Sequence, residues 1–214
     1  MATATSDVPP PIRVLVVDDH PMMRQGLHSL IGHEADMLLV GEASRGDEAV
    51  EAFRRLQPDV VLMDLQMQGG DGLGAIRSIR EVSPEANIVV LTSYAGDARI
   101  ARALAMGARA YLLKASGAQE ILRAIRAAVR GRRTVSPAAA RQLADHVGTE
   151  TLTSREVAVL RLAAQGQGNR AIAASLLVSE ETVKSRMRSI FTKLGADDRT
   201  HAVTLARERG FLDS

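Results

Sequence analysis

Short apolar runs alternate with amphipathic stretches over the first 130 residues. The runs are rich in Val, Ile and Leu and lack polar alternation, which is typical of strands buried on both faces. The stretches between them have helical spacing, and in the last one Ile121, Leu122 and Ile125 belong to one apolar stripe. The predicted strands are 12–17, 37–41, 60–63, 87–91 and 108–113, and the predicted helices are 21–32, 46–56, 72–81, 97–106 and 117–130.

Five strands that alternate with five helices predict a doubly wound α/β domain over residues 12–130. Its sheet would be five-stranded and parallel, with right-handed crossovers. Ligands of such domains gather beyond the carboxyl ends of the strands. The residues that follow each strand are therefore the first place to search for chemistry.

A different pattern follows residue 130. Residues 131–150 are predicted to be a linker with an Ala-rich helical middle, and residues 151–214 to form a second, all-α domain. In that domain Thr153 and Glu156 form a T-x-x-E capping box, and Ser179 is a candidate N-cap. Four short helices with tight turns, at 154–165, 169–176, 180–194 and 199–209, predict a helix-turn-helix module.

Charge divides along the same line. The net charge is +2 overall, but residues 1–130 hold 14 basic and 16 acidic side chains, whereas residues 131–214 hold 13 and 9. Such an asymmetry indicates two modules with different partners.

Composition excludes several classes. The absence of Cys excludes disulfide scaffolds, cysteine-ligated metals and thiol catalysis, and five aromatic residues are too few for a platform that stacks single-stranded nucleic acid. No apolar stretch of about 18 residues predicts a membrane span. Residues 1–11 lack the features of a signal peptide and are expected to be a disordered tail, so a cytoplasmic protein is expected.

Three carboxylates follow two of the predicted strands. Asp18 and Asp19 follow the first strand, and Asp64 follows the third. Neighbouring parallel strands would bring these like charges together, which is unfavourable unless a cation neutralises them. An all-oxygen set is what Mg²⁺ prefers. A single Asp at a strand end commonly caps a helix or starts a turn, but the set of three favours a metal site.

A hydroxyl and an ammonium group follow the last two predicted strands. Thr92 follows the fourth strand and Lys114 the fifth. The chain has 24 Arg and only three Lys, and Lys114 is the only Lys before residue 184. A compact point charge at this position suits the pairing of one phosphate group, although an ordinary surface lysine is the simpler alternative.

These motifs together resemble the receiver domain of two-component response regulators, a flavodoxin-like fold. V-V-D-D-H, L-M-D-L-Q-M, L-T-S-Y and Y-L-L-K occur in the family's order and spacing over residues 12–130. The resemblance implies that Asp64 is the phosphoacceptor and that Thr92, Lys114 and Tyr111 form the phosphate switch. It also implies a Mg²⁺ site made by Asp18, Asp19, Asp64 and the backbone carbonyl of Gln66.

One departure and two rejected motifs complete this half of the chain. The family usually has Pro where Gln68 stands, which leaves the conformation of that loop open. The run Gly69–Gly74 contains no GxGxxG and follows the wrong strand for a nucleotide-binding fingerprint. His20 opens a predicted helix beside Pro21, where a histidine is more often structural than catalytic.

The third helix of the second domain is basic. Between Thr182 and Ala196 the chain has four basic residues and no acidic one. Val183, Met187, Ile190 and Leu194 form an apolar stripe that is expected to face the core. The opposite face is then basic and hydrogen-bonding, as an element that enters the DNA major groove requires. A merely solvated face is the alternative.

The second domain resembles the LuxR-type helix-turn-helix of NarL/FixJ response regulators. The matching residues include Leu152–Glu156, Gly166-x-x-Asn169-Arg170, Thr182-Val183-Lys184 and Lys193-Leu194-Gly195. The resemblance makes 180–194 the recognition helix and double-stranded DNA the partner. It implies base contacts from Lys184, Ser185 and Arg188, and phosphate contacts from Thr182, Arg186 and Lys193.

The combined prediction is a response regulator and not an enzyme. A sensor histidine kinase would phosphorylate Asp64, which would promote homodimerisation and binding to paired DNA half-sites. A constitutively dimeric, phosphorylation-independent regulator is one alternative. A Mg²⁺-dependent aspartyl-phosphate hydrolase is another, but it needs an acid or base near the acceptor, typically two residues on, where Gln66 stands. The kinase, the target genes and the direction of regulation cannot be predicted from the sequence.

Overall fold

The chain folds into two compact units, each with its own apolar core. The computed structural model describes residues 9–67, 70–93, 96–146 and 149–212. The first unit comprises the described residues of 1–93 and 102–137, and the second those of 94–101 and 138–214. Gln68 and most of the predicted tail, residues 1–8, lie outside the described residues.

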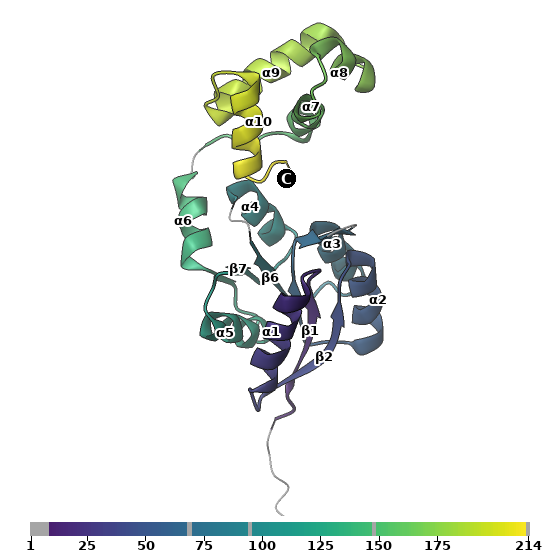
Figure 1. The fold of residues 1–214 in the computed structure, drawn as a ribbon, viewed down its shortest axis with the longest axis vertical. Coiled ribbons are helices and arrows are strands. Elements are labelled where there is room, and N and C mark those ends of the chain that lie inside the picture. The colour runs from purple at the N-terminus through teal and green to yellow at the C-terminus, as the bar shows by residue number, and fades with distance from the viewer. Residues whose placement is uncertain (1–8, 68–69, 94–95, 147–148, 213–214) are drawn as a thin grey trace, which may run out of the picture. The chain divides into compact units, whose positions relative to one another are not determined.

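A parallel sheet organises the first unit (Figure 1). Its strands are β1 (Ile12–Val17), β2 (Met37–Ala43), β3 (Val60–Met63), β6 (Ile88–Thr92), β7 (Ala110–Leu113) and β8 (Thr134–Val135), in the order β2-β1-β3-β6-β7-β8. Every neighbouring pair is parallel. The predicted α/β fold class is confirmed, and all five predicted strands are present.

The predicted strand count requires a correction, because β8 adds a sixth strand. Thr134 and Val135 pair with Ala110 and Tyr111 of β7. The main-chain N–H groups of Thr134 and Ser136 donate to the carbonyls of Arg109 and Tyr111 at 2.9 and 3.0 Å. Two residues without an apolar run carry no periodic signal, so the sequence pattern could not predict this strand.

Helices cover both faces of the sheet. The helices α1 (Pro21–Gly32) and α5 (Ala118–Val129) lie on one face, and α2 (Gly46–Leu56) and α3 (Gly72–Val82) on the other, as Figure 1 shows. Alternate strand residues such as Val14, Val16, Leu62 and Leu91 pack with α1 and α5 in one buried cluster. The helix α4 (Asp97–Ala105) connects β6 to β7. A small antiparallel pair, β4 (Gln66–Met67) and β5 (Gly70–Asp71), follows β3.

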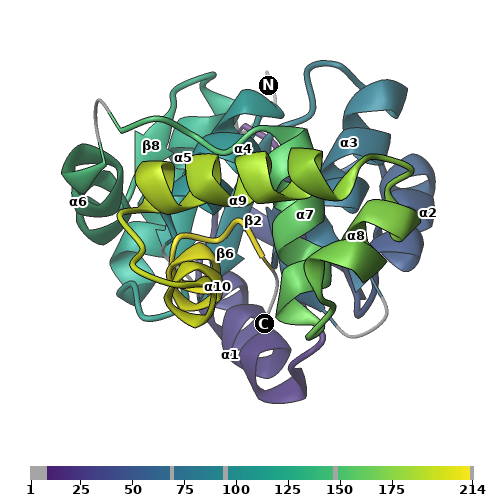
Figure 2. The ribbon, with the colours of Figure 1, turned by 90° about the horizontal axis from the view of Figure 1, so that it is seen from above.

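The second unit is helical. It contains α7 (Ser154–Ala164), α8 (Asn169–Ser175), α9 (Glu180–Leu194) and α10 (Arg199–Glu208), and α9 packs against the other three (Figure 2). These are the four predicted helices. A further helix, α6 (Pro137–Asp145), occupies the middle of the predicted linker.

Local signals set the helix ends of this unit. The capping box of Thr153 and Glu156 and the Ser179 N-cap are both confirmed. Gly166 after α7 and Gly195 after α9 have φ of +82° and +67°, a region that favours glycine because it has no Cβ. Within the described residues, no helix combines the length and the apolar character that crossing a membrane requires.

Candidate functional site

The acidic cluster lies where the order of the strands reverses. From β1 the chain moves outward to β2 and then returns to β3 on the other side of β1. Ligands of doubly wound sheets bind in the crevice at such a switch point. Asp18 directly follows β1 and Asp64 directly follows β3, so the crevice between these two strands is flanked by carboxylates.

One ammonium group joins two of the carboxylates. Lys114, which follows β7, has its Nζ 2.7 Å from Asp18 Oδ2 and 2.8 Å from Asp64 Oδ2. Asp18 and Asp64 are each only 2% exposed, and the Lys114 side chain is 14% exposed. The predicted gathering of these three side chains is therefore found, and it is largely shielded from water.

Burial and pairing act differently on the two partners. Burial raises the pKa of Asp64, and the hydrogen bonds from Lys114 and from the Gln66 main-chain N–H, at 3.1 Å, offset this only in part. For Lys114, burial acts to lower the pKa, but hydrogen bonds to Asp18 and Asp64 outweigh it and the pKa is raised. The pKa of Lys114 is raised because its one ammonium group is shared by two carboxylates. The cluster therefore keeps excess negative charge, which favours a further cation.

The donor set suits a divalent cation. Asp18, Asp19, His20 and Asp64 each offer one ligand atom, and these four atoms lie within 4.8 Å of one another. Three of the four are carboxylate oxygens, the ligand type that Mg²⁺ prefers. The Mg²⁺ prediction thus fits the chemistry of these residues.

Two of the three predicted switch residues, Thr92 and Tyr111, are fully buried. Thr92, the last residue of β6, and Tyr111 of β7 are each 0% exposed. The Thr92 hydroxyl has no hydrogen-bond partner among the described residues. A buried hydroxyl without a partner is costly, so Thr92 has a reason to bind an acceptor that arrives nearby.

Two residues support the acidic cluster without having been predicted. The Arg24 guanidinium donates to the Asp18 carbonyl oxygen at 2.6 Å. A Cβ on Gly72, the first residue of α3, would collide with the backbone of Asp64 and Leu65. Gly72 therefore lets α3 begin directly against the backbone segment that follows β3. This close approach is a structural reason for a glycine in the run 69–74.

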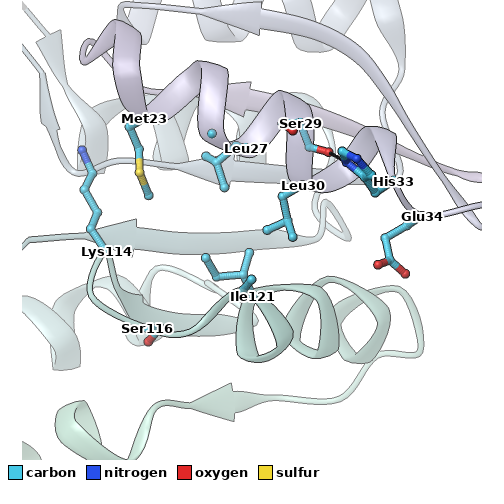
Figure 3. A pocket seen from close by; sticks show the side chains of 11 residues that line it. Met23, Leu27, Ser29, Leu30, His33, Glu34, Lys114, Ser116 and Ile121 are labelled. Carbon is cyan, nitrogen blue, oxygen red and sulfur yellow. Dashed lines mark hydrogen bonds between the residues drawn. The ribbon is translucent and has the colours of Figure 1, made fainter.

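An open groove lies between α1 and α5 (Figure 3). Its volume is about 510 Å³, and its walls include Met23, Leu27, Leu30 and Ile121. Figure 3 shows Lys114 at one end and Glu34 at the other. Asp64 does not line this groove, so the groove is not a pocket above the Asp64 carboxylate.

The helix α9 has the predicted two faces. Val183, Met187, Ile190 and Leu194 are buried, which confirms the apolar stripe. Lys184, Ser185 and Arg188 are exposed, whereas Thr182 and Arg186 are partly buried. The guanidinium groups of Arg186 and Arg188 have no hydrogen-bond or ion-pair partner among the described residues. Within the described part of the chain, Lys184 makes only a surface pair with Glu180, at 3.5 Å.

A shallow groove of about 250 Å³ runs beside this face of α9. Lys184 and Arg188 line it together with Arg199 of α10 and Asn169 of α8. The Arg199 side chain donates to Asn169 Oδ1 and to the Gln167 carbonyl, so it fixes the start of α8. The groove thus gathers three basic side chains from two helices.

Lys193 has a different environment from the other basic residues of α9. Its Nζ lies 3.0 Å from Glu156 Oε2, and the side chain is 14% exposed. Ser189 Oγ also donates to Glu156, at 2.7 Å, so the capping carboxylate of α7 holds α9 at two points. The predicted phosphate contact of Lys193 stays a prediction, and this ion pair gives the residue a structural task as well.

Glu156 is 5% exposed, and its pKa is strongly lowered. Burial acts to raise the pKa, but hydrogen bonds from the Thr153 main chain, Ser189, Lys193 and the Thr153 hydroxyl outweigh it. The pKa falls from 4.5 to about 2. Because the folded-state pKa is below the unfolded one, the ionised carboxylate stabilises the fold above about pH 4.5 and loses this effect as the pH falls towards 2.

We expect Glu156→Gln to lower the free energy of unfolding of the helical unit by about 2–3 kcal/mol at pH 7. The difference from wild type should shrink as the pH falls from 5 to 3, because the unfolded wild-type chain then binds a proton at Glu156 that the folded chain, with a pKa of about 2, does not yet bind. Hydrogen exchange at the α7 and α9 amides measures this unit alone. Glu180→Gln, on the exposed side of α9, is the control and should change stability by less than about 0.5 kcal/mol. A pH-independent difference would contradict the role of the charge.

Comparison with known families divides the chain into the same two parts as the sequence patterns, an α/β part and a helical part. Residues 14–126 match the family described as response regulator receiver domain. Residues 150–206 match the family described as bacterial regulatory proteins, luxR family.

Matches to two relatives cover nearly the whole of both sequences. The transcriptional regulatory proteins YdfI and LiaR of Bacillus subtilis are each 40% identical, over 94% of this chain and 97% and 100% of their own lengths. A solved structure of RcsB from Salmonella enterica serovar Typhimurium, bound to promoter P1flhDC with the phosphomimetic BeF₃⁻, is 26% identical with a TM-score of 0.72. The match covers 92% of this chain and 98% of that one.

Proposed function

The chain belongs to the response regulators that join a receiver domain to a LuxR-type DNA-binding domain, and from this premise we propose how its residues divide the work. Phosphorylation of Asp64 by a sensor histidine kinase controls homodimerisation and sequence-specific DNA binding. The observation that carries the proposal is the position of Asp64. It is a buried carboxylate at the switch point of the sheet, in contact with Lys114 and near two further carboxylates.

In the proposed transfer, a carboxylate oxygen of Asp64 attacks phosphorus. A P–O bond forms as the P–N bond of the kinase phosphohistidine breaks, and its electron pair returns to the imidazole. Lys114, already 2.8 Å from the Asp64 carboxylate, then pairs with a phosphoryl oxygen. Asp18, Asp19, Asp64 and the Gln66 carbonyl would hold Mg²⁺, which when bound would supply positive charge for the phosphoryl oxygens.

The proposed switch depends on Thr92 and Tyr111. The phosphoryl group gives the unpartnered Thr92 hydroxyl an acceptor, so the end of β6 moves towards Asp64. Space beside the displaced threonine then allows Tyr111 to change its rotamer. Because Tyr111 lies on β7, between β6 and β8, its movement reaches the segment that leads to α6.

DNA binding is assigned to α9. Lys184, Ser185 and Arg188 contact bases in the major groove, and Thr182, Arg186 and Lys193 contact phosphates. The guanidinium of Arg188 is exposed and has no partner among the described residues, and together with the basic groove beside it this supports the assignment. The promoter complex of RcsB, a protein of the same family, supports it further. The paired Lys193 is its weakest member.

The domain boundaries remain part of the proposal: a tail over 1–11, a receiver over 12–130, a linker over 131–150 and a DNA-binding domain over 151–214.

The family regulates transcription, and the absence of enzymatic turnover is likewise proposed. A hydrolase needs an acid or base beside Asp64. Position 66, which contacts the Asp64 carboxylate, offers a main-chain N–H and a glutamine side chain instead.

A phosphodonor experiment tests the proposal. The full chain is incubated with acetyl phosphate and Mg²⁺, and intact mass and peptide mapping are expected to show one hydroxylamine-labile phosphoryl group, on Asp64. Asp64→Asn should remain unlabelled, the exposed Asp47→Asn control should be labelled, and EDTA should abolish labelling. Label on another residue would contradict the assignment, and multiple turnovers of a phosphoester would favour the hydrolase.

A further inference from the structure

His20 lies closer to the acidic cluster than its place in the chain suggests. It is the N-cap of α1, and Pro21 is the first helical residue. Its main-chain N–H donates to Asp18 Oδ1 at 2.9 Å. The ring turns back over the cluster, so that Nδ1 lies 3.2 Å from Asp18 Oδ1 and 2.7 Å from Asp19 Oδ1.

These three atoms have the spacing of neighbouring metal ligands. In an octahedral ion with bonds of about 2.1 Å, adjacent ligand atoms lie about 3.0 Å apart and opposite ones about 4.2 Å apart. The separations of 2.7 and 3.2 Å match adjacent positions, and the full set with Asp64 stays within 4.8 Å. An imidazole nitrogen this close to two carboxylate oxygens requires a proton or a cation between them.

The ring is also placed to meet an ion that arrives from solvent. The His20 side chain is 66% exposed, whereas Asp18 beneath it is 2% exposed. Lys114 Nζ is 3.5 Å from the same Nδ1 and pairs with Asp18 and Asp64, so an arriving cation competes with this ammonium group for the carboxylates. The imidazole nitrogen is thus on the solvent-exposed side of a site whose buried side is formed by carboxylates.

We propose that Nδ1 of His20 is a direct ligand of the acidic site, so that the site prefers divalent transition cations to Mg²⁺. The inference rests on the metal site of the proposed function and adds a nitrogen donor to it. Imidazole binds Co²⁺, Ni²⁺ and Zn²⁺ well and Mg²⁺ poorly, because Mg²⁺ selects oxygen ligands and retains its waters. His20 therefore adds affinity for the first group and almost none for Mg²⁺.

Calorimetric titration of the full chain with Co²⁺ and with Mg²⁺ tests the inference. His20→Ala is expected to weaken Co²⁺ binding at least about tenfold and to change Mg²⁺ binding less than about twofold. His28→Ala is the matched control, because His28 lies on the same helix, is 67% exposed and pairs with Glu42 away from the cluster. It should change neither affinity.

A spectroscopic readout makes the result independent of the variant's stability. Co²⁺-loaded wild type should show a paramagnetically shifted imidazole N–H resonance that His20→Ala lacks and His28→Ala retains. Equal loss of Co²⁺ and Mg²⁺ affinity in His20→Ala, or the absence of a shifted imidazole resonance in wild type, would overturn the ligand role and leave His20 as a hydrogen-bond partner of the carboxylates. Failure of wild type to bind either ion would instead overturn the proposed metal site itself.

Discussion

In Asp64→Asn, beryllofluoride with Mg²⁺ is expected to leave DNA affinity unchanged, whereas in wild type it should raise affinity about 5- to 150-fold, the usual range of allosteric coupling. The analogue mimics a phosphoryl group on a carboxylate oxygen, and Asn lacks the anionic oxygen that holds it. Because burial already raises the pKa of Asp64, a neutral amide is tolerated there and the variant should fold.

Fluorescence anisotropy with an operator selected by wild type from a random DNA pool measures this effect. Sedimentation of the same samples should show dimers only where affinity rises, since two half-sites require a two-fold protein. Asp47→Asn, an exposed change on α2, should respond as wild type does. Equal affinity with and without the analogue in wild type would favour the constitutively dimeric alternative.

Removal of the two exposed basic side chains of α9 should have a comparable effect on DNA. Lys184→Ala with Arg188→Ala is expected to weaken operator binding about 100-fold, at about 1–3 kcal/mol for each lost contact. The slope of log affinity against log salt should change only as far as these residues also neutralise phosphates. Both side chains are exposed, and among the described residues Lys184 has only a surface pair with Glu180 and Arg188 has no ion pair, so stability should change little.

The control for this pair is Arg161→Ala, an exposed arginine on α7. It removes a positive charge from the same unit but leaves α9 intact, so operator affinity should fall less than about threefold. Phosphodonor labelling of Asp64 should be normal in both variants. If the α7 variant lost as much affinity as the α9 variant, general charge and not the α9 face would account for binding.

The strands and the acidic cluster could be predicted because both depend on local pattern and topology. Apolar runs indicated the central strands, and the carboxyl ends of adjacent parallel strands necessarily meet. Asp18 and Asp64 are 46 residues apart, yet the sequence already placed both at strand ends beside β1 and β3. The apolar stripe of α9 was predicted for the same reason, since helical spacing alone defines it.

Features that depend on rotamers or on packing between distant segments could not be predicted in this way. The ring of His20 turns towards the carboxylates, but the sequence shows only that it precedes Pro21. The ion pair of Lys193 with Glu156 depends on how α7 packs against α9, so a basic residue that looked free for DNA is already paired. The strand β8 depends on pairing with β7, and its two residues show no periodic pattern.

The short strand β8 also determines where the first unit can be separated from the rest. Its two residues occupy the outer edge of β7, whose main-chain groups would otherwise face solvent. An uncovered edge strand is a template for pairing with another chain, and Tyr111 and Leu112 beside it are apolar. A receiver fragment that ends at residue 130 lacks this cover and invites edge-to-edge aggregation, whereas one that ends after Ser136 keeps it.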